Sequence, residues 1–232
     1  MMRNNSPFSN LIPLFGLLFS PAVYPLNDTQ EQVKNVLAEV ATINDDCWAY
    51  TLNGSLTDGG KFLATRNPGR ESGQLWLLEE SAGDDPVATR EKNFQKGRAR
   101  DERAPISSAI NWETVTLLEH QADTSVYSYA PVARDDEEKA MIKNLQGRLY
   151  LDTAKQELQR IEWTAVEPFS PRFGVSIKHF DLQVNYQRLN NSLLPVTTNM
   201  DIKAVVFGVK TIEQKIKMSN TGYFNQCTNA RI

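Results

Sequence analysis

Hydrophobic and polar residues alternate with a period of two along most of the chain. The stretch "CWAYTLNGSL" places Trp48, Tyr50 and Leu52 on one face of a strand and their neighbours on the other. The same pattern continues in "KFLATRNP", "GQLWLLEE" and "NWETVTLLEHQADTSVYSYAP", with Gly, Asn and Pro between the first of these runs. The last run predicts a hairpin that turns near residues 121–124.

The strands predicted in the second half are longer. They are "FGVSIKHFDLQVNYQRL", "LLPVTTNMDIKAVVFG" and "VKTIEQKIKMSNTGYF". Their alternation predicts a sheet with one apolar and one wet face, although it does not decide which face is concave. The phase slips near His179 and Phe180, where a bulge would let a long strand bend.

The stretch "GRLYLDTAKQELQRIEW", Gly147 to Trp163, predicts two short strands joined by a polar turn. Leu149 and Leu151 share one face of the first strand, and Ile161 and Trp163 share one face of the second. Leu158 is out of phase with Ile161, so we expect a bulge or an edge position between them.

Three segments interrupt the strands with a helical or polar pattern. Residues 29–43 carry apolar positions at helical spacing, residues 86–96 form a second, weakly held helix, and "VARDDEEKAMIKNLQ" has acids first and Lys143 near its end. About three helices and ten or eleven strands are thus predicted. Because most strands follow one another directly, this order excludes a parallel βαβ fold and favours a strongly curved antiparallel sheet or barrel.

The first residues have the pattern of a secretory signal peptide. "LIPLFGLLF" is an apolar run of nine residues, followed by the small residues Ser20 and Ala22. A membrane anchor is the alternative, but a spanning helix needs roughly 20 apolar residues. We therefore expect a cleaved segment 1–22 and one domain over 23–232, exported and not integral to a membrane.

The chain has two cysteines, Cys47 and Cys227. In an oxidising compartment such a pair is more often bridged than free. With His120 and His179 they show no metal-ligand spacing. We expect a disulfide and no metal site.

Composition and motifs favour binding over catalysis. The formal net charge is −3, which argues against a nucleic-acid partner, and no catalytic or phosphate-binding motif is present. A hydrolase would need a His beside a nucleophile in a cleft, so we expect no enzyme activity and no cofactor. The basic residues of segment 90–103 form either a solvated surface or a docking site for anionic headgroups or an acidic partner; they are Arg90, Lys92, Lys96, Arg98, Arg100 and Arg103.

Three stretches have a common pattern with a known family. "GRLYLDTAKQELQRIEW" combines Gly, alternating apolar residues, Asp, a short turn and a strand with Arg and Ile; "LLPVTTNMDIKAVVFG" begins at an apolar-Pro pair; "KIKMSNTGYF" leads into an aromatic. With the order of helices and strands, they resemble the LolA/LolB superfamily of periplasmic lipoprotein carriers over about residues 29 to 224. The resemblance implies a mostly β, unclosed barrel whose concave face is covered by helices as a lid, in the periplasm of a Gram-negative bacterium.

The resemblance further implies a non-enzymatic carrier that holds a lipid or a lipidated protein in an apolar cavity. The alternative is a sensor or assembly accessory of the cell envelope, which would use the same fold to bind a protein partner and would fill the cavity with its own side chains. Alternation along the strands selects the candidate cavity walls: Trp48, Tyr50, Leu75, Leu77, Trp163, Phe180, Leu182, Val184, Met200, Ile202, Ile212 and Ile216.

Overall fold

The computed structural model describes residues 26–40, 47–57, 59–69, 75–82, 89, 91–92, 94–95, 106–133, 136–189 and 192–229. The predicted signal peptide, most of segment 83–105 and the end of the predicted first helix lie outside these residues. No helix in the described part is long and apolar enough to cross a membrane.

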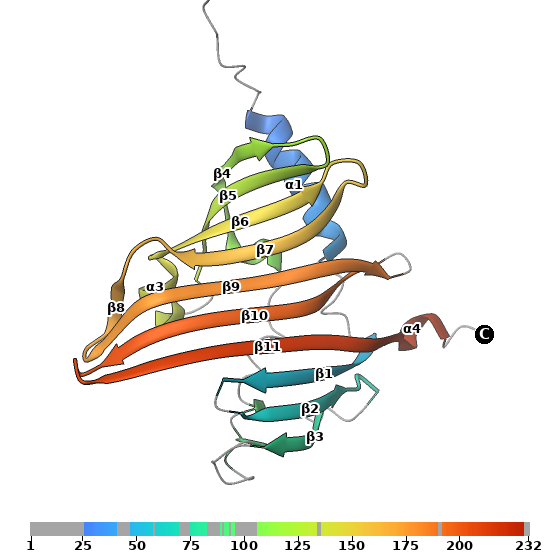
Figure 1. Ribbon diagram of the computed structural model, residues 1–232. Helices are drawn as coiled ribbons and strands as arrows, with labels where there is room; N and C mark the ends of the chain where they lie inside the picture. Colours follow the sequence, from blue (N-terminus) through green and yellow to red (C-terminus); the bar gives the residue numbers. More distant parts are fainter. Residues whose placement is uncertain are drawn as a thin grey trace, which may run out of the picture.

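Eleven strands form one antiparallel sheet, as the alternation predicts. Its order is β3-β2-β1-β11-β10-β9-β7-β6-β5-β4, with β8 paired to β9 (Figure 1). The ends of this order, β3 and β4, are not paired with each other, so the sheet is not closed. The strands are β1 (Trp48–Leu56), β2 (Lys61–Arg66), β3 (Trp76–Ala82), β4 (Ile110–His120), β5 (Thr124–Pro131), β6 (Leu145–Asp152), β7 (Glu157–Ala165), β8 (Phe169–Arg172), β9 (Val175–Leu189), β10 (Ser192–Val206) and β11 (Lys210–Asn225).

Two helices pack on the sheet. They are α1 (Leu26–Val40) and α3 (Asp136–Ile142); a short turn of helix, η2 (Ile106–Ala109), precedes β4, and α4 (Gln226–Asn229) follows β11. Residues 89, 91, 92, 94 and 95 are also helical, and Phe94 packs on the rings of Phe62 and Trp76. The expected total of about three lid helices is not confirmed within the described residues.

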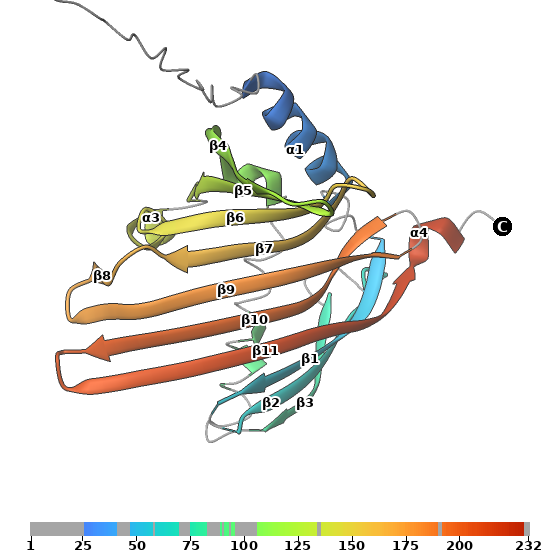
Figure 2. The ribbon, with the colours of Figure 1, turned by 45° about the horizontal axis from the view of Figure 1, so that its top comes forward.

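Helix α1 begins at Leu26, three residues earlier than predicted, and crosses the strands. Its 15 residues span about 22 Å at ~1.5 Å per residue. It contacts β4, β7 and β10, and β4 and β10 are five strand spacings apart, or about 24 Å. Figures 1 and 2 show α1 against the part of the sheet that contains β4–β7, and α3 beside β8.

The predicted bulges are confirmed. Between β6 and β7 the pairing passes from Tyr150–Arg160 to Leu151–Leu158, which leaves Gln159 as the extra residue. Between β9 and β10 it passes from Lys203–His179 to Ala204–Ile177. Each extra residue restores the apolar side chains beyond it to the same face, and Figure 2 shows how strongly the sheet bends.

Cys47 and Cys227 join the start of β1 to the end of β11. Their Cα atoms lie 5.1 Å apart, within the usual range for a disulfide. The neighbouring residues Trp48 and Asn225 are paired in the sheet, and the amide of Gln226 donates to the carbonyl of Cys47 at 2.7 Å. The bond therefore links two strands that backbone pairing already aligns.

Candidate ligand-binding face

One row of apolar side chains crosses the middle of the sheet. Cross-strand pairing aligns Trp163 of β7 with Leu182 of β9, Leu182 with Met200 of β10, Met200 with Ile216 of β11, and Ile216 with Leu56 of β1. We call these five residues the apolar row. Strands lie ~4.8 Å apart, so the row is about 19 Å long.

The apolar row is only half-buried, unlike the clusters around it. All five of its side chains have intermediate exposure. Between α1 and the sheet, by contrast, Val33 and Leu37 of the helix and Leu149 of β6 are fully buried. A side chain that is inaccessible to water gains more from burial than one that stays half-exposed, so the row is where apolar surface is left for another molecule to cover.

Three buried clusters surround the row. The first lies under α1 and contains Leu149, Ile161 and Leu193. The second lies beside α3, where Leu145, Phe169 and Phe180 are buried and Met141 packs on them. The third consists of Leu52, Ala64 and Trp76, with Phe62, Phe94 and Met218 packed against it. The row passes between these clusters and is in contact with the second through Trp163, Leu182 and Met200.

Most of the predicted wall residues share this face of the sheet. Phe180 is buried opposite Ile202, Val184 is half-buried opposite Ile161, and Ile212 is exposed opposite Ala204. Near β3, Trp48 and Tyr50 both pack on the ring of Tyr223, and Tyr50 also packs on Trp76. These two residues belong to the packed interior beside the row, and they do not line it.

The prediction for Leu77 is wrong. Trp76 is the residue of β3 that points into the third cluster, so its neighbour Leu77 lies on the opposite face, where it is exposed. Leu75 precedes the strand and packs against the cluster while partly buried. The inward residues of this strand are therefore Trp76 and Leu78, two positions further on, which also packs on the cluster; the bulge in the β2–β3 pairing follows Leu78.

The predicted wall residues leave out two residues of this face. Leu56 lies opposite Ile216 at the end of the row, and Met218 lies opposite both Thr198 and Gly54. The sequence predicts that Met218 shares a face with Ile212 and Ile216, because the three residues are in phase. Leu56 joins the row through pairing between β1 and β11, which are separated by most of the chain.

Trp163 has its polar atom satisfied by the protein. Its indole Nε1 donates a hydrogen bond to the phenol oxygen of Tyr129. Burial raises the pKa of Tyr129 well above its ordinary value of 10, so this phenol stays neutral at physiological pH. Trp163 can thus present only hydrocarbon surface to the row.

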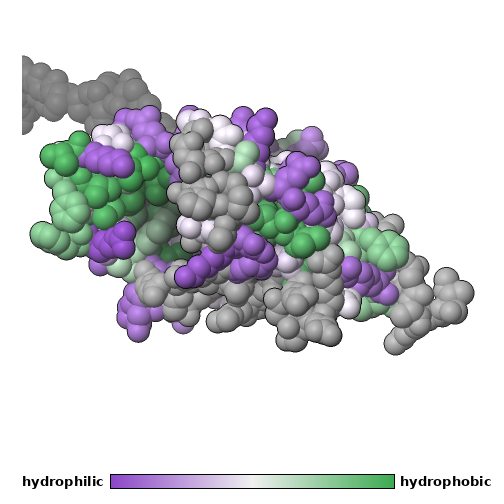
Figure 3. All heavy atoms as spheres, turned by 90° about the horizontal axis from the view of Figure 1, so that it is seen from below, coloured by the Kyte–Doolittle hydropathy of each residue, from purple (hydrophilic) through white to green (hydrophobic). Residues whose placement is uncertain are grey.

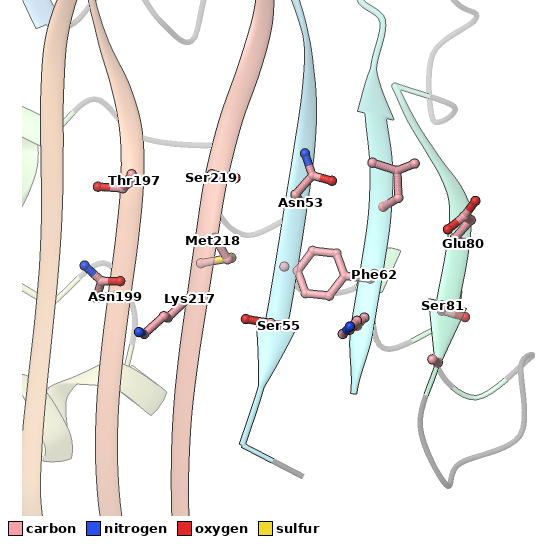
Figure 4. Close-up of a pocket in the computed structure, with 14 residues that line it drawn as sticks. Asn53, Ser55, Phe62, Glu80, Ser81, Thr197, Asn199, Lys217, Met218 and Ser219 are labelled. Atoms are coloured by element: carbon pink, nitrogen blue, oxygen red, sulfur yellow. The ribbon is translucent and has the colours of Figure 1, made fainter. Parts of the chain in front are cut away.

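A groove of about 640 Å³ lies at strands β1, β2, β3, β10 and β11 (Figure 4). Most of its lining belongs to the wet face of the sheet, but Gly54, Phe62 and Met218 of the apolar face also line it. Cross-strand pairs of β1, β10 and β11 supply polar side chains to its lining: Asn53, Ser55, Asn199, Lys217 and Ser219. The charged residues in its lining are Lys61, Glu80 and Lys217.

The two histidines lie apart, His120 on β4 and His179 on β9. The Nδ1 atom of His120 lies 2.8 Å from the hydroxyl of Ser125, its partner across the β4–β5 hairpin, and Ser125 is buried. His179 is exposed next to the bulge of β9. No group of three or more His, Cys, Asp or Glu side chains suited to a metal ion occurs in the described part of the chain. Of the Arg-rich segment, Lys92 is described, and it is exposed.

Fold and site together define a mostly β protein with an open, eleven-stranded antiparallel sheet and an incompletely covered apolar face. No family model and no curated protein matches the chain. Among solved structures, a chain described as "GphF Dehydratase 1" is similar at 5% sequence identity, with a TM-score of 0.17 over 82% of this chain and 83% of that chain. This similarity is too slight to assign a fold family or an activity, and none of the comparisons supports the LolA/LolB resemblance.

Proposed function

We propose that the protein is a non-enzymatic binding protein of the cell envelope that holds an acyl chain of a lipid, or of a lipidated protein, along the apolar row. The observation that carries the proposal is the partial exposure of all five side chains of the row, between clusters whose central residues are buried. Covering apolar surface at roughly 25 cal/mol per Å² would supply the affinity without covalent chemistry.

The shape and chemistry of the row favour a long, flexible hydrocarbon. The row is narrow, because packed clusters flank it on both sides, and it follows the hydrogen-bonding direction of the sheet for about 19 Å. Its aligned side chains offer no polar group to orient a headgroup. Met200 adds an unbranched, adaptable side chain at its centre, which suits an occupant of variable shape.

The remaining part of the proposal concerns location. Export to the periplasm rests on the apolar segment 11–19, and the pairing of Cys47 with Cys227 is compatible with an oxidising compartment. The LolA/LolB resemblance, with helices as a lid, is the corresponding family hypothesis. Helices α1 and α3, on either side of the row, would then be the parts that move when a ligand enters.

A fluorescent fatty-acid probe tests the proposal. We expect the purified protein to bind the probe, and Met200→Ser and Ile216→Ser each to weaken binding roughly fivefold, since each substitution removes a half-exposed apolar side chain worth about 1 kcal/mol. The matched control is Asn199→Ser, which changes the adjacent residue of the same strand on the wet face. Native mass spectrometry of the exported protein should show a bound lipid. A protein that purifies without lipid and ignores the probe would contradict the proposal.

A further inference from the structure

Two neighbouring hairpin turns carry three of the four most exposed large apolar side chains of the described chain. Phe173 lies in the β8–β9 turn, and Phe207 and Val209 lie in the β10–β11 turn; their side chains are 94%, 68% and 88% exposed. The two phenyl rings are 6.2 Å apart and edge to face. We call these three residues the apolar tip. In Figure 3, apolar residues gather at the left-hand end of the molecule, where both turns lie in Figures 1 and 2.

The backbone of the β10–β11 turn does not favour a phenylalanine. Phe207 and Gly208 have φ angles of 49° and 71°, and the amide of Val209 donates to the carbonyl of Val206 at 3.2 Å. Three residues, 207–209, connect the strands, and a tight turn with positive φ angles at both central residues, here Phe207 and Gly208, strongly prefers Asn-Gly. Phe207 therefore adopts an unfavourable conformation and also exposes its ring to water. Neither folding nor core packing explains this choice of residue.

The two turns are nevertheless fixed to each other. The amide of Phe207 donates to the carbonyl of Gly174 at 2.6 Å. A Cβ atom at Gly174 would lie 2.5 Å from the Phe207 ring, so residue 174 must be a glycine for the ring to lie against its backbone. Gly174 itself has a φ of 75°, a conformation that glycine adopts without strain. The tip is thus a preformed projection, with its side chains held outward.

Basic residues flank the tip. Arg172 and Lys210 directly adjoin the two turns, and both are exposed. The stretches "RFGVSIK" (172–178) and "VVFGVKTI" (205–212) contain basic residues and no acid, although the whole chain has a net charge of −3. An apolar crest with cations at its base, on an otherwise acidic protein, matches an anionic lipid surface: apolar side chains enter the interface and cations meet the headgroups.

A second copy of this chain fits the tip less well. Three side chains of this size can bury on the order of 500 Å², whereas a stable protein interface buries about 800 Å² on each partner. The tip also projects outward from two turns and does not form a flat or hollow surface. We propose that the apolar tip docks the protein on membranes that contain anionic lipids, as a peripheral contact. This inference stands whether or not the apolar row binds an acyl chain.

Co-sedimentation with sucrose-loaded vesicles tests the proposal. The wild-type protein should bind vesicles of phosphatidylethanolamine with phosphatidylglycerol, and bind phosphatidylcholine vesicles more weakly. The double variant Phe173→Ser, Phe207→Asn should lose affinity for the anionic vesicles by at least about tenfold. Arg172→Gln with Lys210→Gln should lose roughly fivefold per charge, with a smaller response to salt. The matched control, Leu118→Asn, removes an exposed leucine near the far end of edge strand β4 and should bind like the wild type.

Two outcomes would overturn the proposal. One is wild-type protein that stays in the supernatant with both kinds of vesicle. The other is sedimentation-velocity evidence for a dimer that Phe207→Asn dissociates while vesicle binding is unchanged, which would assign the tip to a second copy. Circular dichroism of each variant separates loss of binding from loss of fold. Binding of the fatty-acid probe is measured without vesicles. A protein that does not bind the probe would therefore contradict the proposed acyl ligand of the apolar row, but not the proposed membrane contact of the apolar tip.

Discussion

The indole Nε1 of Trp163 on β7 donates a hydrogen bond to the phenol oxygen of Tyr129 on β5, across the strand that lies between them. Gly147 on that strand is paired with both residues. A Cβ atom there would lie 2.2 Å from the Tyr129 ring, so the ring reaches Trp163 only because residue 147 has no side chain.

We therefore expect Gly147→Ala to lower the free energy of unfolding by about 1 to 3 kcal/mol, the usual cost of overpacking a core. Tyr129→Phe keeps the ring but leaves the indole N–H of Trp163 unpaired, so it should also lower the free energy of unfolding by about 1 to 3 kcal/mol. Urea unfolding measures both. If Gly147→Ala unfolds like the wild type, the ring does not need the space over residue 147.

The disulfide should contribute strongly to stability, because it closes a loop of 180 residues. In the chain-entropy model such a loop is worth about 4 to 5 kcal/mol. The double variant Cys47→Ser, Cys227→Ser should therefore unfold at a much lower temperature than the oxidised protein. Reductant should lower the wild-type Tm and leave the Tm of the variant unchanged. Equal Tm values with and without reductant would show that the bond adds nothing beyond the β1–β11 pairing that it links.

Two aspartates should change stability in opposite directions with pH. Burial, and next the charge of Glu162, raise the pKa of Asp181, which is also paired with Asp201 across the strands. Its folded pKa exceeds the unfolded value, so its ionised form destabilises the fold once the pH rises above about 4. Asp181→Asn should therefore raise Tm at pH 7, by an amount within about 1 kcal/mol because the site is partly open to solvent, and the gain should vanish at low pH.

Asp152 provides the opposite case. Backbone N–H groups of the β6–β7 turn hold its pKa below the usual range, first that of Lys155 at 2.9 Å and also that of Ala154 at 3.0 Å. Its stabilising effect is therefore present above the unfolded pKa and is lost as the pH falls through the folded pKa. Asp152→Ala should lower Tm at pH 7 and converge with the wild type in acid. Thermal unfolding of Asp181→Asn and Asp152→Ala between low pH and pH 7 checks both predicted changes in Tm.

The sequence predicts the sheet better than it predicts the site. Strict alternation in the long strands groups the residues that share one face of β9, β10 and β11, because a sheet with one apolar face requires a period of two, although it does not decide which face is concave. The run Leu75-Trp76-Leu77-Leu78 is apolar throughout, so alternation cannot tell which of its residues point inward, and the prediction that Leu77 faces the cavity is wrong. Leu56 joins the row only through the register between β1 and β11, which alternation cannot specify. The exposure of the apolar tip also cannot be predicted from alternation, because it depends on where the strands end at the β8–β9 and β10–β11 turns.

Phe207 offers a test in which stability and the proposed membrane contact should separate. Its positive φ costs a side chain with a Cβ roughly 1 to 2 kcal/mol, whereas Asn tolerates this region well. Phe207→Asn creates the Asn-Gly pair that this turn prefers, and loses the edge-to-face contact with Phe173 in exchange. We expect a net gain of about 0.5 to 1 kcal/mol in the free energy of unfolding, measured in urea.

The matched control is Phe207→Ala, which loses the same ring contact without the preference for a positive φ and should be less stable than Phe207→Asn. A phenylalanine retained for folding would give the reverse, with both variants less stable than the wild type; a more stable Phe207→Asn that no longer binds anionic vesicles would mean that the turn gives up stability for its exposed ring.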